Sequence, residues 1–412
     1  MKRFGVSHER QPTAARLPES SETLAAMSKP LEDDTAQDTN WPNSGGTRSQ
    51  GLRIWVVTDG KAGDEIPCLG VAEELLGIRN DPIGEVGSPP MDPRLRYPSP
   101  LVLNSPLTGT IEIRRVAPRP PWVWFMPRGP IDPREKHDQP GSPIAPPWPD
   151  ILIASGRRSI AYVRTIKRLA GSATFAVILK DPRTSTHGAD FVWVPEHDRS
   201  KNPSFMRTLT TPHRFSASRI AAVRNNLLLA ITRLPGPRIG LLLGGRTRLG
   251  PFSQDDTDRL CQSLQPLKQS AGSFLITVSR RTPPELLKAV KAAIGDTPCF
   301  IWDKNGPNPY LHILAGADAI VVTGDSHTMI SEASSTGVPV LIFEPHCIKQ
   351  KLTYFGLRMM EEGWARGINT QLTELHSEPH DCTTLVANAI RNTFERQTRT
   401  NSGFVGVTRT AS

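Results

Sequence analysis

The chain has 412 residues, a formal net charge of +9 and a hydrophobic content of 37%. This length predicts two or three domains, and the positive balance suits a nucleotide, a phosphate group or an anionic membrane as partner. No apolar run approaches the roughly 18 residues of a membrane-spanning helix, so no such helix is expected. The five cysteines are scattered without metal-ligand spacing, which favours a reducing cytosol and argues against zinc or a disulfide.

Residues 1–50 are polar and rich in Ser, Thr and Pro, so we expect them to be disordered. The first twenty residues lack the apolar core of a secretory signal. They resemble a transit peptide weakly, but Glu9, Glu19 and Glu22 argue against one. The expected location is cytoplasmic, with peripheral attachment to the inner face of a membrane as the alternative.

The first ordered element is the apolar run 52–58, which predicts a buried strand. A bend with two glycines and a lysine follows at 59–63, and a helix is expected over 66–76. Such a bend can cradle a phosphate. It lacks the complete GxGxxG or Walker pattern, so by itself it is a weak signal.

Residues 79–148 are rich in proline, which removes hydrogen-bond donors and predicts mostly irregular structure. Short strands are expected at 110–116 and 122–126. An insertion of this length can be a lid, a membrane-facing surface or a disordered loop. The aromatic cluster 122–125 favours a docking surface, and the alternative is that it packs on its own domain.

Three further strands are expected at 150–154, 173–179 and 190–194, each followed by a charged loop. Because the carboxyl ends of parallel strands meet at one edge of the sheet, these loops should line one crevice together with the first bend. The residues assigned to this acceptor side are Asp59, Lys61, Gly63, Arg157, Arg158, Asp181, Arg183, His197 and Asp198.

A helix over 216–231 is expected to precede a linker at 233–238, which contains two prolines and a glycine. This linker divides the chain into a first domain over 51–235 and a second domain over 236–380. A terminal helix and tail are expected over 381–412.

The second domain repeats the pattern of alternating strands and helices. Strands are expected at 239–243, 274–278, 300–302, 319–322 and 338–343, with helices at 255–267, 283–294 and 308–314 between them. A Gly-Asp-Ser bend at 324–326 begins one more helix, whose N–H groups and dipole favour anions. Glu332 follows one turn later, where a carboxylate can accept two hydrogen bonds from a ribose diol. The alternative for Glu332 is a solvated helix residue.

These series predict an α/β protein of two Rossmann-like, doubly wound domains that face a central cleft. This is the GT-B-like architecture of nucleotide-sugar glycosyltransferases with two Rossmann domains. Several motifs lie at the predicted strand ends: DGKAG at 59–63, PDILIASGRRS at 149–159, DPR at 181–183, VPEHD at 194–198, TVSRRTP at 277–283, NPY at 308–310 and VTGDSHTMISEA at 322–333.

On these motifs the chain resembles the "elongated mitochondria" fission-protein family over about 52–365, excluding the Pro-rich insertion. Plant members of that family act in mitochondrial fission by recruiting a dynamin-like GTPase, and bacterial members look like glycosyltransferases by fold. Family members often carry His at the position of Asp64 and an Asn-Gln pair near Ile66 and Pro67. This chain has neither.

The expected function is metal-independent transfer of a sugar from a nucleotide-sugar donor, with no permanently bound cofactor. The donor residues would be Gly244, Gly245, Ser279, Arg280, Arg281, Asp325, Ser326, Thr328 and Glu332. His197, Asp198 or Asp59 would act as the general base for the acceptor hydroxyl. The acceptor is unassigned, with a lipid-linked molecule at an anionic membrane surface as one option and no nucleic-acid partner expected.

Two other functions fit the same pattern. A non-catalytic fission-type adaptor or membrane-surface scaffold would retain the fold without the chemistry. A nucleotide-sugar epimerase would use the same donor pocket. Binding of a nucleotide-sugar separates both enzymes from the adaptor, and transfer to an added acceptor separates the transferase from the epimerase.

Overall fold

The computed structural model describes residues 51–79, 101–105, 109–198, 200, 202–302, 306–370 and 378–405. They belong to one compact unit that extends from Arg48 to Ser412. The expectation of disorder for residues 1–50 lies outside the described residues, as does the part of the Pro-rich insertion at 80–100.

The first sheet has seven strands in the order β2-β3-β1-β4-β5-β6-β7. Only the β2–β3 pair is antiparallel. The central strands are continuous apolar runs buried on both faces, as expected for parallel strands covered by helices. The bounds are β1 Leu52–Thr58, β2 Leu101–Ser105, β3 Gly109–Arg115, β4 Ile151–Ser155, β5 Phe175–Leu179, β6 Phe191–Pro195 and β7 Met206–Thr208.

The second sheet has six parallel strands in the order β10-β9-β8-β11-β12-β13. Its order places the carboxyl ends of β9, β8 and β11 next to one another. The bounds are β8 Arg238–Leu243, β9 Ser273–Val278, β10 Cys299–Trp302, β11 Ala319–Thr323, β12 Val340–Phe343 and β13 Arg366–Gly367. Two doubly wound α/β sheets were predicted, and the strand order confirms them.

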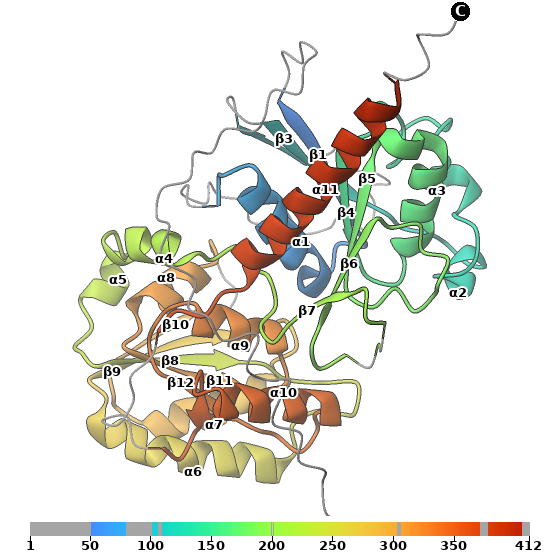
Figure 1. The fold of residues 1–412 in the computed structure, drawn as a ribbon. Helices are drawn as coiled ribbons and strands as arrows, with labels where there is room; N and C mark the ends of the chain where they lie inside the picture. Colours follow the sequence, from blue (N-terminus) through green and yellow to red (C-terminus); the bar gives the residue numbers. More distant parts are fainter. Residues whose placement is uncertain are drawn as a thin grey trace, which may run out of the picture. The chain divides into compact units, whose positions relative to one another are not determined.

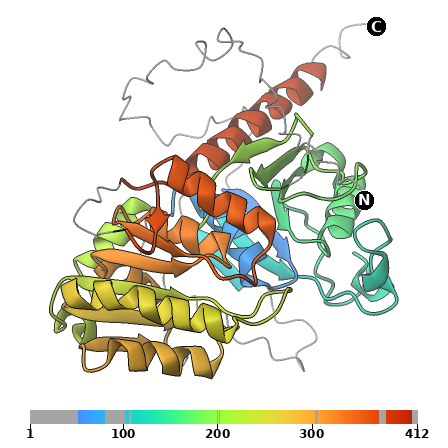
Figure 2. The ribbon, with the colours of Figure 1, turned by 90° about the horizontal axis from the view of Figure 1, so that it is seen from below.

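The helices connect and cover the strands, and in Figure 1 α11 runs alongside α1 over the first sheet. Figure 2 shows the neighbouring helices α6 and α7 beside the second sheet. The bounds are α1 Ala62–Leu75, α2 Trp122–Phe125, α3 Ile160–Ala170, α4 Ala217–Arg224, α5 Leu229–Thr232, α6 Gln254–Ser270, α7 Pro284–Ile294, α8 Tyr310–Gly316, α9 His327–Ser334, α10 Gln350–Glu361 and α11 Thr383–Val405. Among the described helices, none has the length and apolar character to cross a bilayer.

The chain leaves the core of the first sheet and enters that of the second before α4, and not at the expected linker 233–238. Ile220 of α4 and Ile231 of α5 are buried in the core of the second sheet. Conversely, Val386 and Ile390 of α11 are buried in the core of the first sheet. The predicted boundary at 235/236 therefore differs from the structure, because tertiary burial decides which sheet a helix covers. The single helix predicted over 216–231 is instead two helices, α4 and α5.

The Pro-rich segment is more regular than expected. The predicted strand at 110–116 is present as β3, and with β2 it extends the first sheet beyond β1. The predicted strand at 122–126 is wrong, because Trp122–Phe125 forms one helical turn after Pro121. Proline fixes a backbone angle that suits the start of a helix.

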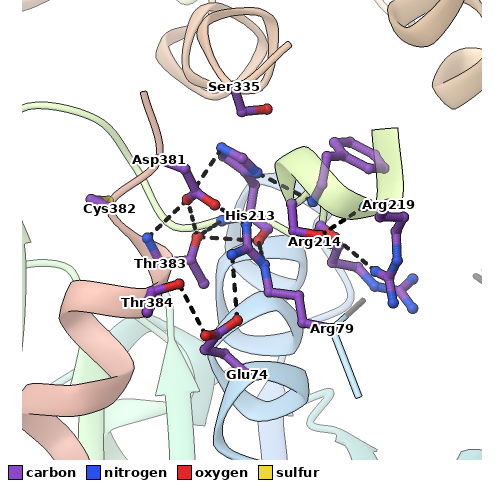
Figure 3. A network of polar contacts seen from close by, with 12 residues as sticks. Glu74, Arg79, His213, Arg214, Arg219, Ser335, Asp381, Cys382, Thr383 and Thr384 are labelled. Carbon is purple, nitrogen blue, oxygen red and sulfur yellow. Dashed lines mark hydrogen bonds and ion pairs between the residues drawn. The ribbon is translucent and has the colours of Figure 1, made fainter. Parts of the chain in front are cut away.

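Buried ion pairs join the two segments in which the chain passes from one sheet to the other, before α4 and before α11. Figure 3 shows the ion pairs around Arg79. Arg79 donates to the carbonyl oxygen of His213 over 3.0 Å and pairs with Asp381. In the last turn of α1, shortly before Arg79, Glu73 accepts from Arg214 over 2.8 Å and from Arg219 over 3.0 Å. These contacts tie α1 to both segments in which the chain changes sheet.

Candidate functional site

The carboxyl ends of β8, β9 and β11 meet around Asp325, whose side chain is fully buried. Its Oδ1 accepts from Thr323 Oγ1 over 2.7 Å, and its Oδ2 accepts from Arg281 over 2.9 Å and from Gly245 N over 3.3 Å. Burial raises the pKa of Asp325, and the bonds from Thr323 and Arg281 oppose that rise. Asp325 is therefore a buried carboxyl group with its partners inside the chain, and it lies among the groups that were expected to bind a diphosphate.

Gly244 and Gly245 have an internal reason to be glycine. A Cβ on Gly244 would lie 1.8 Å from Asp325 Oδ1, and a Cβ on Gly245 would lie 2.1 Å from the carbonyl oxygen of Arg281. The N–H of Gly244 donates to Thr323 Oγ1 over 2.7 Å. The two amides proposed for the diphosphate thus already have partners in the chain.

Ser279 and Arg280 follow β9 and differ in their contacts. Ser279 Oγ lies 3.0 Å from Thr282 Oγ1 and accepts from the N–H of Arg281 over 3.1 Å. Arg280 is exposed, and in the described part of the chain its side chain has no hydrogen bond or ion pair. Arg280 is therefore a cation at these strand ends that is free to meet a ligand.

Helix α9 begins directly after the Asp325 cluster. Ser326 is its N-cap and accepts from Met329 N over 3.4 Å. The N–H groups of His327 and Thr328, in the first turn, have no acceptor within the helix. Together with the helix dipole they form a suitable environment for an anion.

Glu332 lies further along α9 and is 3% exposed. Its Oε2 accepts from the hydroxyl of Tyr310 over 2.7 Å, whereas its Oε1 has no partner in the described residues. Burial raises the pKa of Glu332 to about 7, and the bond from Tyr310 opposes the rise. The solvated-helix alternative for Glu332 is therefore wrong. The sequence reading missed the role of Tyr310, although it belongs to the NPY motif.

At the end of β1 in the first sheet, Asp59 lies beside two positively charged side chains. Its Oδ2 contacts Lys61 and lies 3.7 Å from Arg158, while its Oδ1 is buried without a hydrogen-bond partner in the described residues. The side chain of Asp59 is only 4% exposed. Three of the predicted acceptor-side residues therefore come together here.

Asp64 was not assigned to the site, although its difference from the family pattern pointed to it. Its Oδ1 accepts from Lys180 Nζ over 2.7 Å and from Ser155 Oγ over 3.2 Å. Lys180 also donates to the carbonyl oxygen of Gly63. Lys180 has a φ of 102°, a region that costs energy for a residue with a side chain. The ion pair with Asp64 accompanies this strained backbone.

Three other predicted residues serve local structure. The guanidinium of Arg157 donates to the carbonyl oxygens of Met126, over 3.0 Å, and Val123, over 3.3 Å. Asp181 accepts from the N–H of Arg183 over 2.8 Å, and the Arg183 side chain is exposed. None of these contacts brings Arg157, Asp181 or Arg183 to Asp59.

His197, at the end of β6, packs against residues of the second sheet's helices. Its ring centre lies 4.9 Å from that of His327 and 5.2 Å from that of Phe355. Burial lowers the pKa of His197 to about 4, and neither of its ring nitrogens has a partner among the described residues. Its neighbour Asp198 pairs with Lys351 of α10 over 2.7 Å.

Within the described residues, one group could hold a metal ion by proximity: Asp255, Asp256 and His346, whose ligand atoms lie within 4.8 Å of one another. Asp256 is already used, because it closes the capping box of α6 with Ser253 and pairs with Arg259 over 3.0 Å. These contacts assign Asp256 a structural role.

The two sheets and the polar ends of their strands define a protein of the doubly wound, Rossmann-like α/β class with two sheets. The chain belongs to the mitochondrial fission ELM1 family, whose model matches residues 62–394. The predicted family is thereby confirmed.

Two curated relatives show the extent of the match. The mitochondrial fission protein ELM1 of Arabidopsis thaliana is 31% identical over 242 residues, which cover 53% of this chain and 57% of the relative. The uncharacterized protein RP120 of Rickettsia prowazekii is 32% identical over 143 residues, which cover 33% of this chain and 40% of the relative. The chain thus spans about half the length of these relatives.

Among solved structures, MurG of Acinetobacter baumannii matches with 13% identity and a TM-score of 0.41, over 84% of this chain and 92% of its own. A UDP-glucosyltransferase of Polygonum tinctorium matches with 11% identity and a TM-score of 0.44, over 86% and 95%. The UDP-GlcNAc 2-epimerase of Methanocaldococcus jannaschii has 10% identity and a TM-score of 0.39, over 83% and 99%. The fold class given above rests on the strand order.

Proposed function

We propose that this protein transfers a sugar from a nucleotide-sugar donor, and that the nucleotide binds at the strand ends of the second sheet. The observation that carries the proposal is the buried Glu332, with one carboxylate oxygen on Tyr310 and the other without a partner in the described chain. A buried polar atom without a partner costs roughly 1–3 kcal/mol. A ribose hydroxyl is a donor that would remove this cost.

The protonation of Glu332 supports a link to ligand binding. With a pKa of about 7, the carboxyl group is partly neutral at neutral pH. A diol that donates to Glu332 favours the charged form, since the carboxylate is the better acceptor. Nucleotide binding should therefore lower the pKa of Glu332 and strengthen as the pH rises through 7.

The diphosphate would be held by Arg280 and the first turn of α9. Arg280 is exposed and uncommitted in the described chain, whereas Arg281 is paired with Asp325. The N–H groups of His327 and Thr328 add donors at the positive end of the helix dipole. Positive charge here would stabilise the leaving diphosphate, on which negative charge develops.

Of the three candidates for the general base, we favour Asp59. Its Oδ1 is without a partner in the described residues, so it can accept a proton from an acceptor hydroxyl. His197 is enclosed by His327 and Phe355. Asp198, like Asp59, pairs with a lysine, but it has no buried carboxylate oxygen without a partner in the described residues.

Isothermal calorimetry with UDP-, GDP-, ADP- and CMP-sugars tests the proposal. We expect one nucleotide class to bind, and Glu332→Gln to weaken that binding by roughly tenfold without lowering the melting temperature. Glu285→Gln, at an exposed position of α7, is the matched control and should change neither. Absence of binding to every nucleotide sugar would reject the proposal. So would a Glu332→Gln variant that loses stability but keeps its affinity.

The second candidate is a non-catalytic adaptor at a membrane surface. Trp124 and Phe125, which are 70% and 58% exposed, favour it, as does membership of a family named for mitochondrial fission. An adaptor would bind no nucleotide sugar. An epimerase would bind one and convert its sugar without an added acceptor, so product analysis after incubation with the donor alone separates it from a transferase.

A further inference from the structure

A surface hollow of about 480 Å³ lies between α3 and the loop after α2. Three cations line it, Lys136, Arg164 and Arg168, together with a single carboxylate, Asp138. In the described part of the chain none of the three cations forms an ion pair. The hollow therefore carries an excess of positive charge that the described residues do not neutralise.

Arg164 is fixed in place by neutral groups. Its guanidinium donates to the carbonyl oxygens of Pro127, over 3.3 Å, Arg128, over 3.0 Å, and Gly129, over 2.6 Å. Carbonyl oxygens orient the guanidinium but leave its charge in place. Burial and the neighbouring charge of Arg168 lower the pKa of Arg164.

The exposed aromatic turn α2 is continuous with this hollow. The carbonyl oxygen of Phe125 accepts from Gly129 N over 2.7 Å, and Gly129 in turn is bound by Arg164. Pro130, the next residue, lines the hollow. Both views place the α2 segment beside α3 (Figure 1, Figure 2). Two large exposed aromatic side chains, Trp124 and Phe125, thus lie on a turn that is hydrogen-bonded to the segment that Arg164 binds.

We propose that the α2 turn and the cationic hollow form one docking surface for an anionic phospholipid bilayer. Trp124 and Phe125 would lie at the level of the headgroups, where aromatic side chains are favoured. The phosphate of an anionic headgroup would enter the hollow and meet Arg164, Arg168 and Lys136. The charge complementarity of the hollow selects an anionic surface, and the exposed aromatic rings select a bilayer. This surface is independent of the nucleotide site.

Sedimentation of the full chain with vesicles tests this surface. Vesicles of equal parts phosphatidylcholine and phosphatidylglycerol should bind the protein, and vesicles of phosphatidylcholine alone should not. Arg168→Glu should weaken binding by at least roughly tenfold, since it reverses one charge at the surface. Its control is Lys291→Glu, because Lys291 is likewise an exposed cation in the last turn of a helix.

A second pair of variants tests the aromatic turn. The double change Trp124→Ser with Phe125→Ser should weaken vesicle binding by roughly tenfold or more, because it removes the apolar contribution to binding. Leu385→Ser on α11, where Leu385 is 59% exposed, is the control and should leave binding unchanged. Trp124, Phe125 and Leu385 are all exposed, so circular dichroism should show that all variants fold.

Three results would overturn the proposal. The first is absence of binding to the anionic vesicles. The second is equal weakening by Arg168→Glu and Lys291→Glu, which would mean attraction by net charge alone. The third is loss of a calorimetric signal for glycerol phosphate in Arg168→Glu while vesicle binding is unchanged, which would identify the hollow as a site for a free phosphate ester.

Discussion

Glu73 and Glu332 are two glutamates with the same exposure, 3%, and opposite surroundings. Glu73 of α1 receives two buried arginines, Arg214 and Arg219, and so has a partner for each carboxylate oxygen. Glu332 of α9 accepts from one hydroxyl group, that of Tyr310, and has no cation beside it among the described residues.

The difference separates a structural carboxylate from a candidate ligand-binding one. A buried charge is stable when oppositely charged and hydrogen-bonding groups surround it, as at Glu73. At Glu332 the described chain leaves one oxygen without a partner, and burial instead raises the pKa to about 7. The buried acceptor without a partner in the described residues is what makes Glu332, and not Glu73, the candidate for a ligand.

The largest effect should come from Glu73. We expect Glu73→Gln to reduce the free energy of unfolding by about 3–5 kcal/mol, because it leaves two buried guanidinium groups without their carboxylate. Urea denaturation measures this change. Glu74→Gln is the control, since Glu74 is more exposed and lies 3.4 Å from Arg79. An equal loss in the two variants would contradict the structural role assigned to Glu73.

The pH dependence of the free energy of unfolding should reveal the raised pKa of Glu332. Its pKa in the folded protein, about 7, is above the ordinary value of 4.5, so the stabilising contribution of its neutral form is complete below pH 4.5. That contribution is lost as the pH rises through 7, and the interval corresponds to roughly 3 kcal/mol.

Urea denaturation of the wild type and Glu332→Gln between pH 4 and pH 8 measures this contribution to the free energy of unfolding. The variant cannot ionise, so its stability relative to the wild type should increase with pH. A constant difference across the range would show that Glu332 titrates normally in the folded protein.

Arg280 and Arg281 offer a comparison between adjacent cations. Arg280→Ala should weaken nucleotide binding roughly ten- to hundredfold with little change in melting temperature, since it removes a charge-assisted contact with the ligand. Arg281→Ala should lower the melting temperature, because Asp325 then loses its cation. Calorimetry and thermal unfolding distinguish the two. The assignment fails if Arg280→Ala leaves the affinity intact.

The smallest effect should come from Tyr310→Phe, which removes the hydroxyl group that binds Glu332. A typical hydrogen bond contributes about 1 kcal/mol. The bond lowers the pKa of Glu332, so its loss should raise that pKa further. Nucleotide affinity should then begin to increase at a higher pH than in the wild type. An unchanged pH profile would argue against a link between Glu332 and the ligand.

Much of the fold was predictable from local patterns in the sequence. Apolar runs of five or six residues with loops of glycine and charged residues behind them located most strands of both sheets, including β11 and β12. The Gly-Asp-Ser bend located the start of α9. These features depend on neighbours in the chain, so a sequence pattern is enough to reveal them.

The partners of the charged residues were not predictable in the same way. The sequence placed Asp325 and Gly245 at one sheet edge, but only the tertiary structure showed that they bind each other over 3.3 Å. The same holds for Asp198, whose partner Lys351 is 153 residues away.

By itself, the sequence determined two α/β sheets, the family and the strand ends at which we propose a ligand site. The tertiary structure alone decided that α4 and α5 cover the second sheet and that α11 covers the first. It also decided which charges are neutralised among the described residues, where Glu332 has no cation beside it. The reason is physical: strand and helix formation follow from short-range periodicity, whereas burial and the pairing of charges arise from contacts between residues far apart in the chain.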